Sequence, residues 1–180
     1  MSKTKKPVIG YVGQGYVGKT SADNLERRGF TVIRYALEPE YRGNKEKIKD
    51  ADIVFVAVPT PTTERGHRTD IVEDAVSLAR PGAIVVIKST ILPGTTSRVQ
   101  KKFPKLIVLN NPEFLSEKTA WYDMLHPDRQ IVGFTDQSME VSSLVLSLLP
   151  KAPFMSPWGI NTYQHTRITA TEAEMIKYAG

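Results

Sequence analysis

The chain has 180 residues, with 24 Lys or Arg against 19 Asp or Glu, so its formal net charge is +5. It contains no Cys, which excludes disulfides and thiolate metal sites, and its three His residues are far apart, so no metal site is expected. No apolar run is long enough to cross a membrane, and residues 1–6 are too polar for a secretion signal. The basic residues are scattered, which argues against a nucleic-acid partner and leaves anionic small molecules as compatible ligands. We therefore expect a globular protein of the cytoplasm.

Short apolar runs rich in β-branched residues alternate with amphipathic segments along the chain. The alternation predicts strands at 7–12, 31–35, 52–58, 83–88, 106–109, 130–134 and 152–155. It predicts helices at 17–28, at 71–79 with Asp70 as N-cap, and at 116–125, 137–149 and 171–179. Such alternation is typical of βαβ units, so we expect an α/β fold with a doubly wound, mostly parallel, Rossmann-like sheet and helices on both faces.

A glycine-rich turn follows the first predicted strand. It reads Gly13-Gln14-Gly15-Tyr16-Val17-Gly18, a GxGxxG pattern placed between a strand and a helix. In such a turn the first glycine permits the bend, the second lets a pyrophosphate approach the backbone, and the third lets the helix press on the sheet. Free N–H groups at the helix N-terminus favour phosphate. The sequence therefore predicts dinucleotide binding.

The second predicted strand lacks the acidic residue that usually holds the ribose of NAD. Ala36 stands at the expected position, and Glu38, two residues later, is the candidate substitute. Arg34 and Arg42 are close enough in sequence to leave a 2′-phosphate, and hence NADP, open. We predict NAD, bound tighter than NADP by about tenfold or more.

Polar clusters follow several of the later strands. They read VPTPT from Val58, KST-x-x-PGTT from Lys88, NPEFL-x-E from Asn111 and AEMIKYA from Ala173. Taken singly, each has an ordinary explanation as turn hydroxyls, helix caps or a solvated lysine. In this order, and with the glycine turn, they resemble the N-terminal NAD-binding domain of the UDP-glucose/GDP-mannose dehydrogenase family over residues 8–180.

The resemblance implies an NAD-dependent oxidoreductase that oxidises the primary alcohol of a UDP- or GDP-hexose to a uronic acid. The cofactor contacts expected on this basis, together with the Glu38 prediction, are Gly13, Gly15, Tyr16, Val17, Gly18, Glu38, Thr60, Ser89, Thr90 and Glu117. The expected substrate contacts are Glu113, Phe114, Leu115 and Lys177.

The resemblance also implies catalytic roles for three of these residues. Thr90 and Glu117 match positions that face the nicotinamide and organise a water for proton transfer. Lys177 matches a lysine that stabilises negative charge on the reacting oxygen. These roles suit an alcohol oxidation, which needs a base and a partner for the developing oxyanion.

Two features depart from the family pattern. Segment 36–50 is short where the family usually has an extra helix, and the cysteine nucleophile of the second oxidation has no counterpart, since the chain has no Cys. We therefore interpret residues 1–168 as a dinucleotide-binding domain and 169–180 as the start of a helix connecting to a second domain. We expect the chain to be inactive alone. Any homo-oligomer is expected to form through segments outside this sequence.

Several alternatives stay open at this point. The terminal helix, capped by Thr169 or Thr171, could instead pack on the chain's own sheet. The whole could be a two-electron dehydrogenase of the β-hydroxyacid type with Lys177 as its acid/base, or a non-catalytic NAD-binding module.

Overall fold

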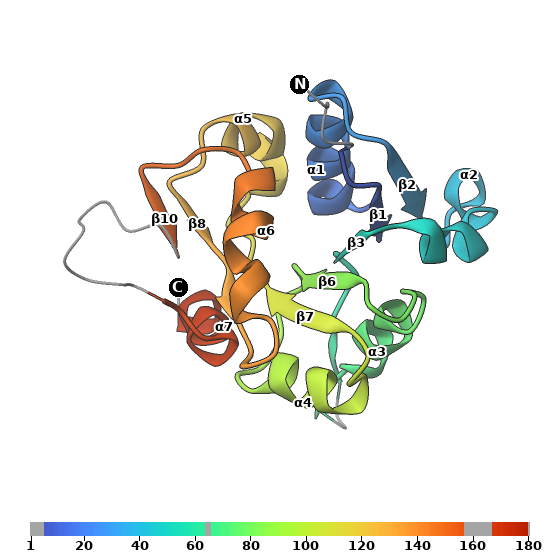
Figure 1. Cartoon of the computed structure of the whole chain (residues 1–180). Helices are drawn as coiled ribbons and strands as arrows, with labels where there is room; N and C mark the ends of the chain where they lie inside the picture. Colours follow the sequence, from blue (N-terminus) through green and yellow to red (C-terminus); the bar gives the residue numbers. More distant parts are fainter. Residues whose placement is uncertain (1–5, 64–65, 157–166, 180) are drawn as a thin grey trace, which may run out of the picture.

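The computed structural model describes residues 6–63, 66–156 and 167–179. Its centre is a six-stranded sheet in the order β2-β1-β3-β6-β7-β9 (Figure 1). The strands are β1 (Ile9–Val12), β2 (Val32–Tyr35), β3 (Ile53–Val56), β6 (Ile84–Ile87), β7 (Ile107–Asn110) and β9 (Gly133–Phe134). Neighbouring strands pair in parallel except β9, which is antiparallel to β7. The predicted mostly parallel, doubly wound sheet is confirmed.

Helices cover both faces of this sheet. One face packs against α1 (Tyr16–Arg27) and α6 (Ser142–Leu148). The other packs against the 3₁₀ helix η1 (Lys45–Asp50), α3 (Asp70–Val76) and α4 (Thr95–Lys102). Successive strand residues point to opposite faces, so in β3 Ile53 and Phe55 join the first core while Val54 and Val56 join the second. Burial on both faces explains why β1, β3 and β6 read as apolar runs, whereas β2, half-buried at the edge of the sheet, includes Arg34.

The remaining elements are short. They are α2 (Pro39–Arg42), the hairpin β4 (Thr62–Thr63) and β5 (Gly66–His67), η2 (Glu117–Thr119), α5 (Ala120–Leu125), β8 (Arg129–Ile131), η3 (Met139–Val141), β10 (Phe154–Ser156) and α7 (Ala170–Ala179). Strands β8 and β10 pair in parallel as a separate two-stranded sheet beside the central one (Figure 1). Among the described helices, none combines the length and apolar character needed to cross a bilayer.

The sheet reverses its direction of growth next to β1. Chain order places β2 on one side of β1 and then β3 on the other. Connections that leave two adjacent parallel strands in opposite directions open a crevice at their carboxyl ends, which is where such sheets bind ligands. The glycine turn follows β1 directly and therefore lies in this crevice.

Three local predictions need correction. The single strand expected at 130–134 is divided into β8 and β9, which belong to different sheets. Helix α4 was not predicted, because the residues it buries include Thr95, Thr96 and Gln100, which leave little apolar periodicity. Asp70 is the first residue of α3 and its carboxylate pairs with Arg68, so the N-cap position belongs to Thr69.

The C-terminal helix α7 packs on the chain's own sheet. Thr169 and Glu172 form a capping box at its start, with the Thr169 N–H donating to Glu172 Oε2 at 2.7 Å. Ala170 and Ala173 are buried against β9, and a Cβ on Gly133 would lie 2.6 Å from Ala173 Cβ. Met175 and Tyr178 stay largely exposed. The capping role predicted for Thr169 is confirmed.

Candidate cofactor and substrate site

The glycine turn has the geometry expected of a pyrophosphate-binding loop. Gly13 has φ +93°, and a Cβ there would lie 2.2 Å from the carbonyl oxygen of Ala57. A Cβ on Gly18 would lie 1.9 Å from the carbonyl oxygen of Gly13, so only glycine lets α1 approach the turn. Gly15 faces open space, and the first turn of α1 has no side-chain cap. The turn therefore leaves room and backbone N–H groups for a phosphate.

The two arginines that had left NADP open are both engaged within the protein. Arg34, on β2, pairs with Asp23 at 2.6 Å and Glu26 at 2.7 Å, both on α1. Arg42 donates two hydrogen bonds to the carbonyl oxygen of Leu37. The charge of Arg34 is thus compensated by two carboxylates and is not available to a 2′-phosphate, whereas Arg42 bonds only a neutral carbonyl group and keeps its positive charge.

The two positions considered for the acidic ribose contact lie at the end of β2 and in the segment that follows it. Ala36 is buried, and Glu38 is exposed at the N-cap of α2, where its carbonyl oxygen accepts the N–H groups of Tyr41 and Arg42. The ribose contact assigned to Glu38 stays a prediction.

The loops after β3 and β6 are tied together by hydroxyl groups. Thr60 Oγ1 donates to the carbonyl oxygen of Thr90 at 2.6 Å. Ser89 is buried, and its hydroxyl accepts the N–H of Val58 at 2.9 Å and donates to the Val58 carbonyl at 2.7 Å. The Ser89 hydroxyl thus fixes the end of β3, while Thr90 is exposed beside it. A direct cofactor contact by the Ser89 side chain is therefore not favoured by this geometry.

Phe114 and Lys177, predicted to share the substrate site, lie together although they are 63 positions apart in sequence. Lys177 Nζ lies 5.4 Å from the centre of the Phe114 ring, and Arg129 Cζ lies 5.1 Å from it. Cations at such distances are attracted to an aromatic face. Helix α7 thus brings a cation to the loop that follows β7, at the carboxyl edge of the sheet.

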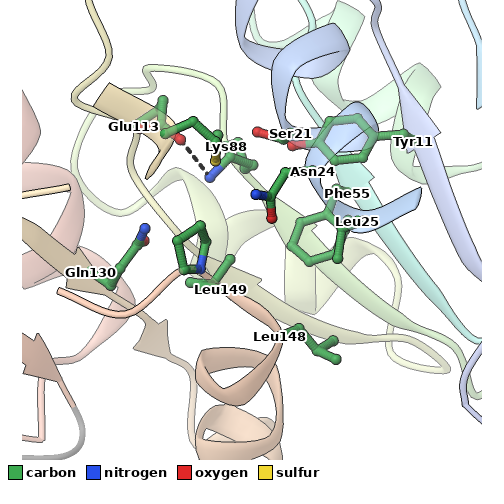
Figure 2. A pocket seen from close by; sticks show the side chains of 12 residues that line it. Tyr11, Ser21, Asn24, Leu25, Phe55, Lys88, Glu113, Gln130, Leu148 and Leu149 are labelled. Carbon is green, nitrogen blue, oxygen red and sulfur yellow. Dashed lines mark ion pairs between the residues drawn. The ribbon is translucent and has the colours of Figure 1, made fainter. Parts of the chain in front are cut away.

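Glu113 is held in this loop by contacts inside the protein. Its Oε2 pairs with Lys88 Nζ at 2.9 Å, and its Oε1 accepts the Phe114 N–H at 2.8 Å. Lys88 Nζ also donates to Asn111 Oδ1 at 2.6 Å. Figure 2 shows Glu113 and Lys88 pointing toward one another at the wall of a small cavity. The volume of this cavity is about 20 Å³. The predicted contact between Glu113 and the substrate therefore competes with an internal ion pair.

The same cavity is bounded by Tyr11 from β1, with Ser21 and Asn24 from α1. The Tyr11 ring stacks on Phe55, and burial raises the pKa of its hydroxyl, which keeps the group neutral. A volume of this size holds about one water molecule. The cavity lies inside the domain and is too small for a nucleotide.

Glu117 and Leu115 complete the predicted set. Glu117 is exposed at the start of η2, and Leu115 is half-buried. The turn around them is fixed by Asp123, whose carboxylate accepts the Ser116 N–H at 2.9 Å and the Thr119 hydroxyl at 2.8 Å. These bonds hold the pKa of Asp123 below its ordinary value.

Sequence reasoning assigned no role to four residues that shape this region. They are Lys88, Asn111, Arg129 and Glu174. The signal available for Lys88 was a polar residue directly after a fully apolar strand, and for Asn111 it was its place in the polar pair Asn110-Asn111 that ends the apolar run of β7. In the part of the chain that the structure describes, no cluster of acidic or histidine side chains could hold a metal ion.

The reversal of the sheet at β1, the glycine turn and the uncapped start of α1 together define a dinucleotide-binding domain. Comparison with known proteins then assigns the family. Residues 36–148 match the model of the UDP-glucose/GDP-mannose dehydrogenase family, NAD binding domain. The chain belongs to this family, and its cofactor is NAD.

Individual relatives agree with this assignment. The chain is 29% identical to the UDP-glucose 6-dehydrogenase AglM of Haloferax volcanii, covering 96% of this chain and 50% of the relative. It is 32% identical to the UDP-glucose 6-dehydrogenase YwqF of Bacillus subtilis, covering 88% and 36%. The solved structure of a UDP-glucose dehydrogenase from Pyrobaculum islandicum superposes with a TM-score of 0.79 at 25% identity, covering 99% and 50%. The chain thus spans half or less of the length of these relatives.

Proposed function

We propose that this chain is the NAD-binding half of a nucleotide-sugar 6-dehydrogenase that oxidises a UDP- or GDP-hexose to the uronic acid. The observation that carries the proposal is the meeting of Lys177 with Phe114 at the carboxyl edge of the sheet that also bears the glycine turn. A cation at that edge suits an alcohol whose oxygen gains negative charge as it is oxidised. The cytoplasmic location is a prediction of the same proposal.

Each oxidation removes a hydride from carbon and a proton from oxygen. NAD, when bound, supplies the hydride acceptor. The exposed positions of Thr90 and Glu117 are compatible with holding a water that takes up the proton. Lys177 stabilises the charge on the oxygen, and the loop of Glu113, Phe114 and Leu115 lies against the sugar nucleotide. The cysteine that the family uses in its second oxidation has to come from outside these 180 residues.

The test is NADH formation by the protein expressed from its natural gene. UDP-glucose, GDP-mannose and N-acetylated UDP-hexosamines are offered in turn, and NADH is counted per sugar consumed. Two NADH per sugar supports the proposal. One NADH per sugar indicates a two-electron dehydrogenase, and NAD binding without turnover indicates a non-catalytic module.

The role of Lys177 is tested in the same protein. Lys177→Ala should lower kcat by about two orders of magnitude or more, as losses of oxyanion-stabilising groups do. Lys118→Ala, which removes an exposed lysine of η2, is the matched control and should leave turnover unchanged. Weaker substrate binding with unchanged turnover would refute the charge-stabilising role.

A further inference from the structure

Lys88 is a buried lysine to which neither the sequence motifs nor the proposed chemistry gives a role. It follows β6 directly, and its side chain is only 3% exposed. Its ammonium group contacts Asn111 Oδ1 at 2.6 Å and Glu113 Oε2 at 2.9 Å, both in the segment that follows β7. Asn111 in turn donates to the carbonyl oxygen of Ile131 on β8 at 2.7 Å. One cation thus joins the ends of two neighbouring strands.

Stability alone gives little reason for this arrangement. Removing an ammonium and a carboxylate from water is costly, and replacing a buried ion pair by apolar side chains of similar size is often neutral or stabilising. What such a pair does impose is a defined geometry, because removing either partner leaves the other charge buried and unpaired. The pair is better explained by what it positions.

The group that it positions is the loop carrying Phe114. While Oε2 of Glu113 is held by Lys88, Oε1 accepts the Phe114 N–H at 2.8 Å. The ring of Phe114 then lies between two cations, at 5.4 Å from Lys177 Nζ and 5.1 Å from Arg129 Cζ. The path from Lys88 through Glu113 to Phe114 is continuous, with each contact at hydrogen-bond distance.

We propose that Lys88 is a positioning residue for the substrate side of the site. It contacts neither substrate nor cofactor, and it sets the place of Glu113 and of the 112–115 loop against which the nucleotide sugar would lie. Ser89 and Thr90 follow it in sequence on the cofactor side, but the contacts of the Lys88 side chain run to Asn111 and Glu113 on the substrate side. The word substrate here rests on the proposed function, whereas the position of the loop does not.

The first arm of the test measures the loop itself in this chain. Lys88→Met roughly keeps the length of the side chain and removes its charge. The Glu113 carboxylate then has no cation to hold it and can move away from the Phe114 N–H that it accepts. We expect hydrogen exchange of the Phe114 amide, followed by NMR, to become faster by about tenfold or more. Unchanged exchange would overturn the proposal.

Gln100→Leu is the matched control. Gln100 is a buried polar residue near the opposite end of β7. Its side-chain Nε2 donates to the Leu106 carbonyl oxygen and its Oε1 accepts the Val108 N–H, each at 2.8 Å. At a similar loss of thermal stability it should leave Phe114 exchange as in the wild type. Equal acceleration in both variants would show general loosening and would contradict a positioning role.

The second arm uses the protein from its natural gene. Lys88→Met should lower kcat/KM for the nucleotide sugar by about tenfold or more while changing the Kd of NAD by less than about threefold. An unchanged kcat/KM, or an equal loss of NAD affinity, would overturn the proposal. If the wild type binds NAD but oxidises no sugar, the proposed function fails, and the exchange comparison still decides the role of Lys88.

A second variant covers the case in which Lys88→Met does not fold. Lys88→Met combined with Glu113→Gln removes both charges of the pair, which should let the chain fold, and keeps a side-chain oxygen able to accept the Phe114 N–H. Rapid Phe114 exchange in this folded double variant supports the proposal. Slow, wild-type exchange in it refutes the proposal.

Discussion

Replacing Glu174, a side chain on the last helix α7, should destabilise the domain strongly. Glu174 is 1% exposed on α7, and its carboxylate accepts the N–H of Gly94 at 2.5 Å and that of Thr96 at 2.7 Å. These groups are at the N-terminus of α4, whose N-cap, Gly94, has no side chain to cap it. Glu174→Ala removes two hydrogen bonds to a charged group and leaves buried donors unpaired, which together cost about 3 kcal/mol after the gain from no longer burying a charge.

Thermal unfolding followed by circular dichroism measures this cost. For a chain of this length, a loss of about 3 kcal/mol lowers Tm by about 6–12 °C. Glu172→Ala is the control on the same helix: it removes an exposed capping-box carboxylate and should cost about 0.5–1 kcal/mol. Equal shifts for the two variants would refute the bridging role of Glu174.

The pH dependence of Glu174→Gln tests the electrostatics of the same group. Burial raises the pKa of Glu174 above its ordinary value, so between the unfolded and folded pKa values the folded state binds more protons. This contribution is fully present below the unfolded pKa and is lost as pH rises through the folded pKa. The free energy of unfolding of the wild type minus that of Glu174→Gln should therefore decrease from about pH 4 upward. An increase of this difference with pH would show that hydrogen bonding to the carboxylate outweighs its burial.

Three further predictions concern the cofactor side. Gly18→Ala should destabilise the fold by about 2 kcal/mol or more because its Cβ would overlap the Gly13 carbonyl oxygen. Gly15→Ala should keep the wild-type Tm and weaken NAD binding by about tenfold in calorimetry, since its Cβ fills the space left for the pyrophosphate. In the wild type, NAD should bind about tenfold or more tighter than NADP, and calorimetry showing the reverse order would contradict the assignment of Arg34 as neutralised by Asp23 and Glu26. Ser89→Ala should lower the free energy of unfolding by about 1–3 kcal/mol, because the buried end of β3 loses its hydroxyl partner. The exposed Ser77→Ala should lower it by only a few tenths of a kcal/mol, and equal denaturant midpoints for the two variants would contradict this role.

The sequence predicts those parts of the fold that depend on local physics. The five parallel strands of the central sheet are found where β-branched apolar runs occur, because recognising such a run needs no knowledge of distant residues. The glycine turn was equally readable from its GxGxxG spacing between a strand and a helix, and the steric conflict at Gly18 arises within the turn itself, whereas that at Gly13 involves Ala57 after β3. The resemblance of the later motifs to a known family predicted which loops converge, and the pairing of Phe114 with Lys177 agrees with it.

The remaining features depend on contacts between distant segments. Helix α4 buries threonines whose environment is set by Glu174, 78 positions away from Thr96, so no local apolar pattern marks it. The segment 130–134 is divided because β8 pairs with β10 and β9 pairs with β7, and Gly133 of β9 also packs closely on α7. The ion pair of Lys88 and Glu113 joins residues 25 positions apart on different loops. None of these partners is identifiable from spacing alone.

Helix α7 connects these observations. Glu174 and Lys177 are three residues apart and so project from neighbouring positions on one side of the helix. Glu174 fixes the helix to the start of α4, and Ala173 fixes it to Gly133, where a Cβ would be 2.6 Å away. The position of Lys177 over Phe114 is therefore set by the contacts of Ala173 and Glu174, which lie about one turn earlier in α7. The loop that holds Phe114 is set independently, by Lys88 from inside the domain. The cation and the ring meet because two separate carboxylates, the buried Glu174 and the partly buried Glu113, hold the helix and the loop.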